Sequence, residues 1–237
     1  MAESAVLASI QVGKPRDLGT EGAADPFDRP WTSGFCKEPV AGPVTLRRTN
    51  LDGDGQADLV HHGGVDKAVC CYPATHYPFW RNELGQAGLP FGSFGENFAI
   101  EGPTEADVCI GDVFRVGGAV VQVSQPRQPC WKLARRWKIK TLTLQVQESG
   151  RTGWYFRVLA EGLVAAGDAL ALAERPHPAW TVAEANRIMH RDKADRAGAA
   201  DLAALPALSS SWKATLTNRL EKAAEPDVKR RLEGGGD

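Results

Sequence analysis

The sequence predicts a mainly β fold, a closed barrel or sandwich with peripheral helices, followed by a small unit of three helices. Up to about Arg175 the chain is dense in glycine and proline, with short apolar runs between them, which is typical of many short strands joined by turns. After the segment RPHP at 175–178 the sequence becomes rich in alanine and poor in glycine. We therefore expect residues 1–175 to form a barrel domain and residues 176–237 to form a C-terminal three-helix domain and tail.

Four apolar runs are the best candidates for strands of the barrel, at 6–12, 69–72, 113–116 and 119–123. Gly117 and Gly118 separate the last two runs. Because glycine readily adopts the positive φ of a two-residue turn, these runs are predicted to form a hairpin. Residues 141–147, TLTLQVQ, alternate with period two and on pattern alone predict a further strand.

The C-terminal region carries three helical signals. Thr181 and Glu184 form a capping box, in which a hydroxyl and a carboxylate bond to free backbone amides at a helix start. The capping box opens an amphipathic stretch that runs to about residue 191. Two more helices are expected at 199–205 and from about 210 to 224.

Composition and charge exclude several classes of protein. The 237 residues carry 28 basic and 29 acidic side chains, a net charge of -1. Nucleic acid and anionic membrane attract chains with a basic excess, so neither is expected as a partner. No run approaches the ~18 apolar residues of a membrane span, and the N-terminus lacks the pattern of a signal peptide. We expect a cytoplasmic protein.

The strongest candidate for a functional site is the segment QVSQPRQPCWKL at 122–133. A β run ends there in a loop fixed by two prolines, and the loop presents Cys130. The window 127–140 contains six basic residues, among them Arg127 and Lys132, and no acidic residue. Nearby cations stabilise a thiolate, so Cys130 is expected to be reactive or metal-binding, while the two cations could bind a phosphate. The alternative is a buried cysteine beside a solvated helix face. The other four cysteines are expected to be buried apolar residues.

A second candidate is the motif HHGGVDK, which begins at His61. Gly63 and Gly64 let the backbone approach a ligand and present successive amides to an anion, while His62 and Lys67 add donors or charge. A hairpin turn with solvated polar neighbours explains the same pattern. Adjacent histidines point to opposite sides of an extended chain, so His61 and His62 are not expected to hold one metal.

Two further polar segments give weaker signals. Glu96 and Asn97 are bracketed by phenylalanines, where polar side chains either bond to a heterocycle or, more commonly, anchor a loop. The acidic run DGDGQAD at 52–58 superficially suggests a calcium loop. Its sixth and twelfth positions are alanine and glycine where glycine and glutamate are needed, so a turn is predicted instead.

Four motifs in order resemble the MOSC family, in particular its YiiM-like branch. They are VxHGGxxKAV at 60–69, FGEN at 94–97, GDVF at 111–114 and QVSQPRxPCxKL at 122–133. The likeness runs from about residue 6 to 173, and the helical tail is similar to the three-helix domain that ends such chains. His61 departs from the pattern, because the relatives carry Val there. The resemblance also implies a helix at 141–147, against the strand that the alternation predicts.

The resemblance implies a MOSC-type β-barrel that holds the molybdenum cofactor (molybdopterin), whose phosphate needs an anion site. By similarity Cys130 is the catalytic residue and the ligand to molybdenum, and a soft thiolate suits that metal. The implied cofactor-binding residues are His62, Gly63, Gly64, Lys67, Glu96, Asn97, Ser124, Arg127 and Lys132.

YiiM-like proteins are associated with N-hydroxylated base detoxification, in which bases such as hydroxylaminopurine are reduced to amines. The resemblance thus implies a molybdenum-dependent oxidoreductase acting on a small N-hydroxylated substrate. The chain has no GxGxxG fingerprint, no flavin-type motif and no iron–sulfur cysteine cluster. Electrons are therefore expected from a separate reductase.

Three other functions stay open on the sequence. Cys130 could carry a persulfide, which would make the protein a molybdenum-cofactor or sulfur carrier. Cys130 could also pair with His62 in a cysteine hydrolase, although nothing places an orienting carboxylate beside them. The three-helix tail could dock the electron donor, although covering apolar surface of the barrel is the simpler role.

Overall fold

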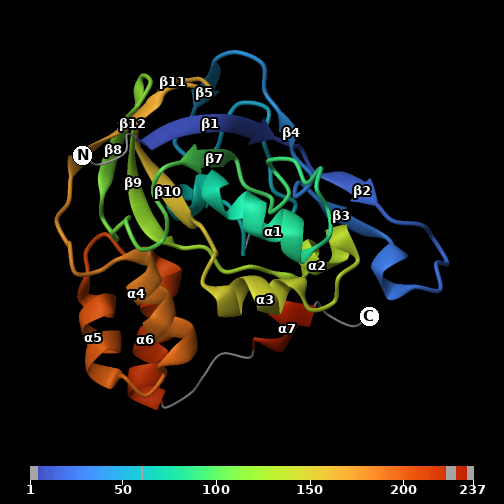
Figure 1. The fold of residues 1–237 in the computed structure, drawn as a ribbon. Coiled ribbons are helices and arrows are strands. Elements are labelled where there is room, and N and C mark those ends of the chain that lie inside the picture. The colour runs from blue at the N-terminus through green and yellow to red at the C-terminus, as the bar shows by residue number, and fades with distance from the viewer. Residues whose placement is uncertain (1–4, 60, 223–227, 234–237) are drawn as a thin grey trace.

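Seven strands of the described chain close into a barrel in the order β12-β8-β9-β10-β6-β7-β1, and β1 pairs back to β12. Figure 1 shows this fold in a computed structural model that describes residues 5–59, 61–222 and 228–233. The barrel strands are β1 (Ala5–Val12), β6 (Val69–Pro73), β7 (Phe98–Glu101), β8 (Val113–Val116), β9 (Ala119–Pro126), β10 (Trp154–Ala160) and β12 (Ala169–Glu174). All four predicted runs lie in these strands, so the mainly β prediction is confirmed, and the fold is a barrel.

The predicted hairpin joins β8 and β9. Val116 pairs with Ala119 across the two glycines, and Gly117 has a φ of +51°. A side chain at Gly117 would meet the carbonyl of Leu163 and the carboxylate of Asp168 at 2.5 Å. The turn therefore requires glycine for its backbone angle and for the close approach of neighbouring chain.

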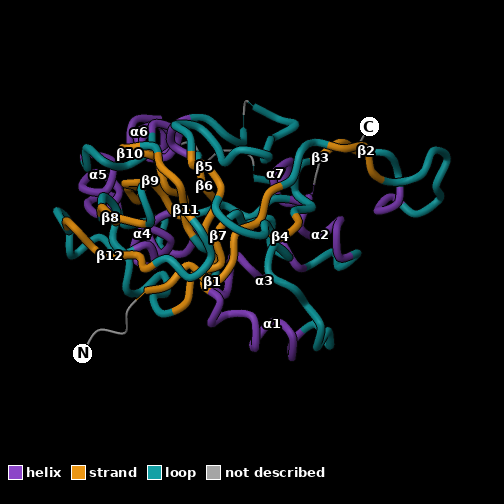
Figure 2. Tube along the Cα trace, turned by 90° about the horizontal axis from the view of Figure 1, so that it is seen from above, coloured by secondary structure: helices purple, strands orange, loops and turns teal. Residues whose placement is uncertain are grey.

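Shorter strands extend the barrel at its rim. They are β2 (Arg16–Leu18), β3 (Trp31–Ser33), β4 (Glu38–Pro39), β5 (Val44–Leu46) and β11 (Gly162–Val164). Of these, β4 continues the sheet beside β1, β5 pairs with β11, and β2 pairs with β3. Figures 1 and 2 show that the β2–β3 hairpin and the 3-10 helix Pro26–Asp28 project from the body of the protein.

Three helices pack around a second, largely aromatic core cluster that includes Tyr72, Trp80 and Phe94. They are α1 (Tyr77–Glu83), α2 (Trp131–Trp137) and α3 (Leu142–Ser149). The strand predicted at 141–147 is wrong, and the helix implied by the resemblance is confirmed. Leu142 and Val146 are both buried in this cluster, and their i, i+4 spacing is that of one helix face.

Three C-terminal helical segments begin and end close to their predicted limits. They are α4 (Val182–Asn186), which continues into a π-helix (Arg187–Arg191), then α5 (Arg196–Ala204) and α6 (Ser210–Lys222). A further helix, α7 (Lys229–Glu233), was not predicted and lies in the segment expected to be a tail. The last two residues of the segment predicted at 210–224 lie outside the described residues. Thr181 caps α4 as predicted, because its hydroxyl accepts from Glu184 N at 3.0 Å. The Glu184 carboxylate instead pairs with Arg187 at 2.8 Å.

The helical region shares the hydrophobic core of the barrel. Ile188, Trp212 and Leu216 are buried in one continuous cluster with barrel residues such as Leu7 and Phe156. The covering role expected for the tail therefore agrees with the packing. None of the helices in the described ranges has the length and apolar character that crossing a bilayer requires.

Candidate functional site

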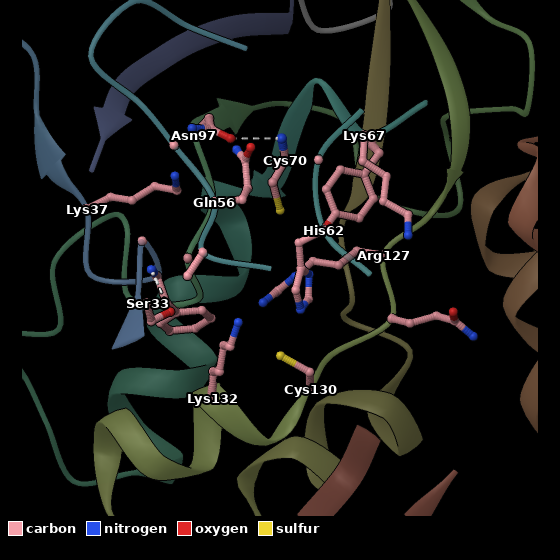
Figure 3. Close-up of a pocket in the computed structure, with 18 residues that line it drawn as sticks. Ser33, Lys37, Gln56, His62, Lys67, Cys70, Asn97, Arg127, Cys130 and Lys132 are labelled. Carbon is pink, nitrogen blue, oxygen red and sulfur yellow. Dashed lines mark hydrogen bonds between the residues drawn. The ribbon is translucent and has the colours of Figure 1, made fainter. Parts of the chain in front are cut away.

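A pocket lies where five segments that are distant in sequence meet around the loop between β9 and α2. Figure 3 shows the pocket with its lining side chains. The lining residues are Ser33, Gly34, Phe35, Lys37, Gly55, Gln56, Ala57, His62, Gly63, Lys67, Cys70, Gly95, Asn97, Arg127, Gln128, Cys130, Lys132 and Tyr155. The enclosed part of the pocket has a volume of about 70 Å³.

Most of the site residues predicted from the sequence line this pocket. They are His62, Gly63, Lys67, Asn97, Arg127, Cys130 and Lys132. The three that do not are Gly64, Glu96 and Ser124. The two strongest sequence motifs, around His62 and around Cys130, are thus brought together by the fold.

Cys130 occupies the N-cap position of α2 and is 8% exposed. Its backbone is extended, with φ −126° and ψ 167°. Its carbonyl accepts from Leu133 N at 3.0 Å and from the hydroxyl of Thr143 at 3.1 Å. The loop and α3 therefore fix the backbone on either side of the thiol, whose sulfur points into the pocket in Figure 3.

Three cations that were predicted for the site surround the pocket. Arg127 is 4% exposed, donates from Nη2 to the carbonyl of Phe94, and has no hydrogen-bond partner for Nη1 among the described residues. Lys67 donates from Nζ to the carbonyl of His61 at 2.7 Å, and burial lowers its pKa. Lys132 is buried beside them. The pocket is electropositive and contains an unused guanidinium donor, as an anion site requires.

His62 is neutral at physiological pH. Its pKa is lowered to about 4, mainly by burial and in part by the positive charges of Lys132, Lys67 and Arg127, against an opposing effect of Asp58. A neutral imidazole can donate one hydrogen bond and accept another. His62 therefore contributes hydrogen-bonding capacity to the pocket but no charge.

The basic window at 127–140 contributes less charge to the pocket than the sequence suggests. Only Arg127 and Lys132 line it. Arg135 packs against the rings of Trp31 in β3 and Trp131 in α2, and Arg136 donates to the carbonyl of Gly92. Successive residues of a helix point about 100° apart, so α2 turns these two side chains toward other neighbours. Lys138 follows the end of α2 and pairs with Asp28.

A buried ion pair between Lys37 and Asp54 was missed by the sequence analysis. Lys37 lines the pocket, and the Asp54 side chain is fully buried. Asp54 also accepts from Gly13 N at 2.8 Å, from Asn97 Nδ2 at 2.9 Å and from Gln56 Nε2 at 3.3 Å. The acidic turn at 52–58 therefore holds one wall of the pocket together. No local signal marks Lys37, because its partner is 17 positions away.

Cys70 is a second thiol of the pocket and was expected to be a plain core residue. It lies in β6, and its backbone N–H donates to Asn97 Oδ1 at 3.1 Å. Figure 3 shows its sulfur across the pocket from that of Cys130. Burial raises the pKa of Cys70 to about 11, so this thiol keeps its proton at neutral pH.

The three predicted residues outside the pocket have other contacts. Glu96 accepts from Gly92 N at 2.6 Å, from Phe94 N at 3.1 Å and from the hydroxyl of Tyr77. Its carboxylate thus anchors the loop, the alternative that the sequence left open. The hydroxyl of Ser124 lies 2.6 Å from the carbonyl of Asp66. Gly64 precedes a 3-10 helix with φ +80°. In the structure these three residues shape the loops around the pocket, and their contact with a cofactor stays a prediction.

Comparison with known proteins matches both parts of the chain. Residues 58–171 match the family model of the MOSC domain, and residues 180–223 match the YiiM-like, 3-alpha helix domain. YflK of Bacillus subtilis (strain 168) is 47% identical over 216 residues, which are 91% of this chain and 95% of that protein. A reductase of Gibberella moniliformis is 38% identical over 161 residues, 67% of this chain but 28% of that longer protein. The crystal structure of YiiM from Geobacillus stearothermophilus has a TM-score of 0.76 and 38% identity, covering 91% of this chain and 99% of that chain.

Proposed function

The chain belongs to the MOSC family, in its YiiM-like branch, and we propose that it is a molybdenum-cofactor-dependent reductase of N-hydroxylated compounds. Its substrates would be bases of the hydroxylaminopurine type, which it would reduce to amines. The observation that carries the proposal is a pocket in which the Cys130 thiol is surrounded by Lys67, Arg127 and Lys132. The similarity to a fungal reductase supports the same class of reaction.

The residues of the pocket fit this cofactor by their chemistry. Cys130 offers a soft sulfur ligand, which suits a metal that is already bound by sulfur. The unpartnered Nη1 of Arg127 is a buried charged donor, and such a donor favours an anion such as the phosphate of the cofactor. The 70 Å³ of the pocket corresponds to roughly two or three water molecules, so it would take only a part of the cofactor.

In this reaction the residues of the chain bind and orient the cofactor and the substrate. The molybdenum cofactor, when bound, supplies the two-electron chemistry that removes the oxygen of the N–OH group. Cys130 would hold the metal, and Arg127, Lys67 and Lys132 would hold the phosphate. The neutral imidazole of His62 can hydrogen-bond a polar substrate without repelling these cations. The thiol of Cys70 keeps a proton at Sγ beside them.

The reaction consumes electrons, so it requires an electron donor. Reduction of one N–OH group to an amine consumes two electrons and two protons and releases one water. Nothing in the sequence resembles a binding motif for a nicotinamide or a flavin. We therefore propose that a separate reductase delivers the electrons, in the cytoplasm, where no nucleic acid or membrane takes part.

The test uses protein expressed in a host that makes the molybdenum cofactor. We expect molybdenum and pterin in equal amounts, and reduction of 6-N-hydroxylaminopurine with an artificial electron donor but not with NADPH alone. Cys130→Ala should lose both metal and activity. The matched control is Cys109→Ala, because Cys109 is a buried cysteine outside the pocket.

Two results would contradict the proposal. Turnover on NADPH alone would remove the need for a separate donor. A persulfide on Cys130 in protein without molybdenum would favour the carrier function instead.

A further inference from the structure

A second cavity, of about 280 Å³, lies between the barrel and the C-terminal helices. It is bounded by the loop at 104–106, by the end of α3 with the residues that follow it, and by the end of α4 with the π-helix. Figure 1 shows α3 and α4 on the same side of the barrel. This cavity shares no lining residue with the pocket around Cys130.

Three arginines line the cavity, and two of them keep an unneutralised charge. Arg151 lies over the ring of Phe79 at 4.0 Å, and its guanidinium has no hydrogen-bond acceptor in the described ranges. Arg191 donates to the backbone carbonyl of Glu148 and forms no salt bridge within those ranges. Arg187, in contrast, is paired with three carboxylates of its own helical region. Arg151 and Arg191 are therefore available to an anion.

Two of these arginines, Arg187 and Arg191, stand at the two ends of the π-helix, and both line the cavity. The turn is held by the buried Arg219 of α6, which donates to the carbonyls of Ile188 and Met189 at 2.9 Å each. π turns of this kind occur frequently at functional sites.

Two buried polar side chains of the lining bear on what the cavity can bind. Asn186 is 6% exposed and donates from Nδ2 to the hydroxyl of Thr152 at 2.8 Å, but its Oδ1 has no partner in the described structure. A buried acceptor without a donor is unfavourable. Glu105, the one carboxylate of the lining, accepts from Gly153 N at 2.6 Å and pairs with His76 Nε2 at 2.7 Å. Its oxygens are therefore directed to these partners, and among the described residues it forms no ion pair with the three arginines.

We propose that this cavity binds a small organic phosphate. Arg151 and Arg191 bind the phosphate, because guanidinium groups match its geometry with paired hydrogen bonds. Asn186 Oδ1 accepts from a hydroxyl of the ligand. The volume lies just below the ~300 Å³ at which sites for small molecules begin, so the ligand is the size of a sugar phosphate. Such a ligand contacts both the barrel side and the helical side of the cavity. Its binding does not depend on the chemistry at Cys130.

The test is isothermal titration calorimetry with ribose 5-phosphate, inorganic phosphate and ribose at about 50 mM salt, where exposed charges are less screened. We expect saturable binding of ribose 5-phosphate, at least tenfold weaker binding of inorganic phosphate, and no binding of ribose. Arg151→Gln and Arg191→Gln should each weaken the binding at least tenfold. Arg115→Gln, which removes an exposed arginine of β8, should leave it unchanged.

A further variant separates the two sites. Lys132→Gln alters the pocket around Cys130 and should leave the affinity for ribose 5-phosphate within twofold of wild type. Loss of binding in Lys132→Gln would place the phosphate in that pocket and overturn the proposal. Undiminished binding in both Arg151→Gln and Arg191→Gln would overturn it equally, as would the absence of saturable binding to the wild-type chain.

Discussion

Arg231 donates a hydrogen bond to the carbonyl of Pro129 at 2.6 Å, although the two residues are 102 positions apart. A second nitrogen of the same guanidinium donates to Gln147 Oε1 of α3, also at 2.6 Å. Pro129 directly precedes Cys130 in the loop that presents the thiol. The C-terminal helix α7 therefore fixes the position of the residue at the centre of the candidate site.

Removal of this contact should make the loop that carries Cys130 more mobile. We expect Arg231→Ala to increase hydrogen exchange at least tenfold in the segment 127–134, because even one of the two lost charged hydrogen bonds is worth about 1.5–3 kcal/mol and ~1.4 kcal/mol is tenfold. Arg231→Lys should restore part of the protection. The control is Lys213→Ala, which removes a half-buried cation of α6 whose exposed hydrogen bond goes to the carbonyl of Pro206. Unchanged exchange in Arg231→Ala would show that the loop holds its position without α7.

The ion pair between Lys37 and Asp54 should matter for stability more than any exposed pair. Asp54→Asn leaves Lys37 buried without a counter-charge and should lower the free energy of unfolding by about 3 kcal/mol in urea denaturation. In the double variant Lys37→Met/Asp54→Asn more than half of that loss should be recovered, because no charge is then left unpaired. Asp52→Asn is the matched control. It breaks an exposed pair with Arg47 and should cost less than about 1 kcal/mol.

The protonation of His62 should make stability depend on pH between about 6.5 and 4. The folded protein holds the pKa of His62 at about 4, whereas an unfolded chain has a value near 6.5. Between these values the unfolded chain binds more protons, so stability falls as the pH falls, in total by on the order of 2–3 kcal/mol.

Urea denaturation of the ligand-free protein at pH 7, 5.5 and 4.5 measures this slope. His62→Gln should reduce the slope relative to wild type. Burial also lowers the pKa of His190, to about 3, so part of the slope should remain in the variant. Identical slopes in the two proteins would mean that His62 does not titrate as described.

The sequence predicted the site where its signals were contiguous. Cys130, Arg127 and Lys132 lie within six positions of one another, and all three line the pocket. The glycine motif around His62 was also visible as a single segment. At 141–147 the alternation wrongly predicted a strand where the structure has a helix, because a short apolar pattern fits both periods.

By itself the sequence determined four of the seven barrel strands, the hairpin at Gly117 and the first three helical segments of the C-terminal region, since apolar runs, turn residues and caps act over a few neighbouring positions. Only the tertiary structure decided which charges face the thiol. The turns of α2 direct Arg135 and Arg136 toward other neighbours, and Lys138 lies beyond the end of that helix beside Asp28. The fold brings Lys37 and Cys70 to the pocket from distant segments. These arrangements depend on contacts between residues far apart in the chain, and local patterns carry no information about such contacts.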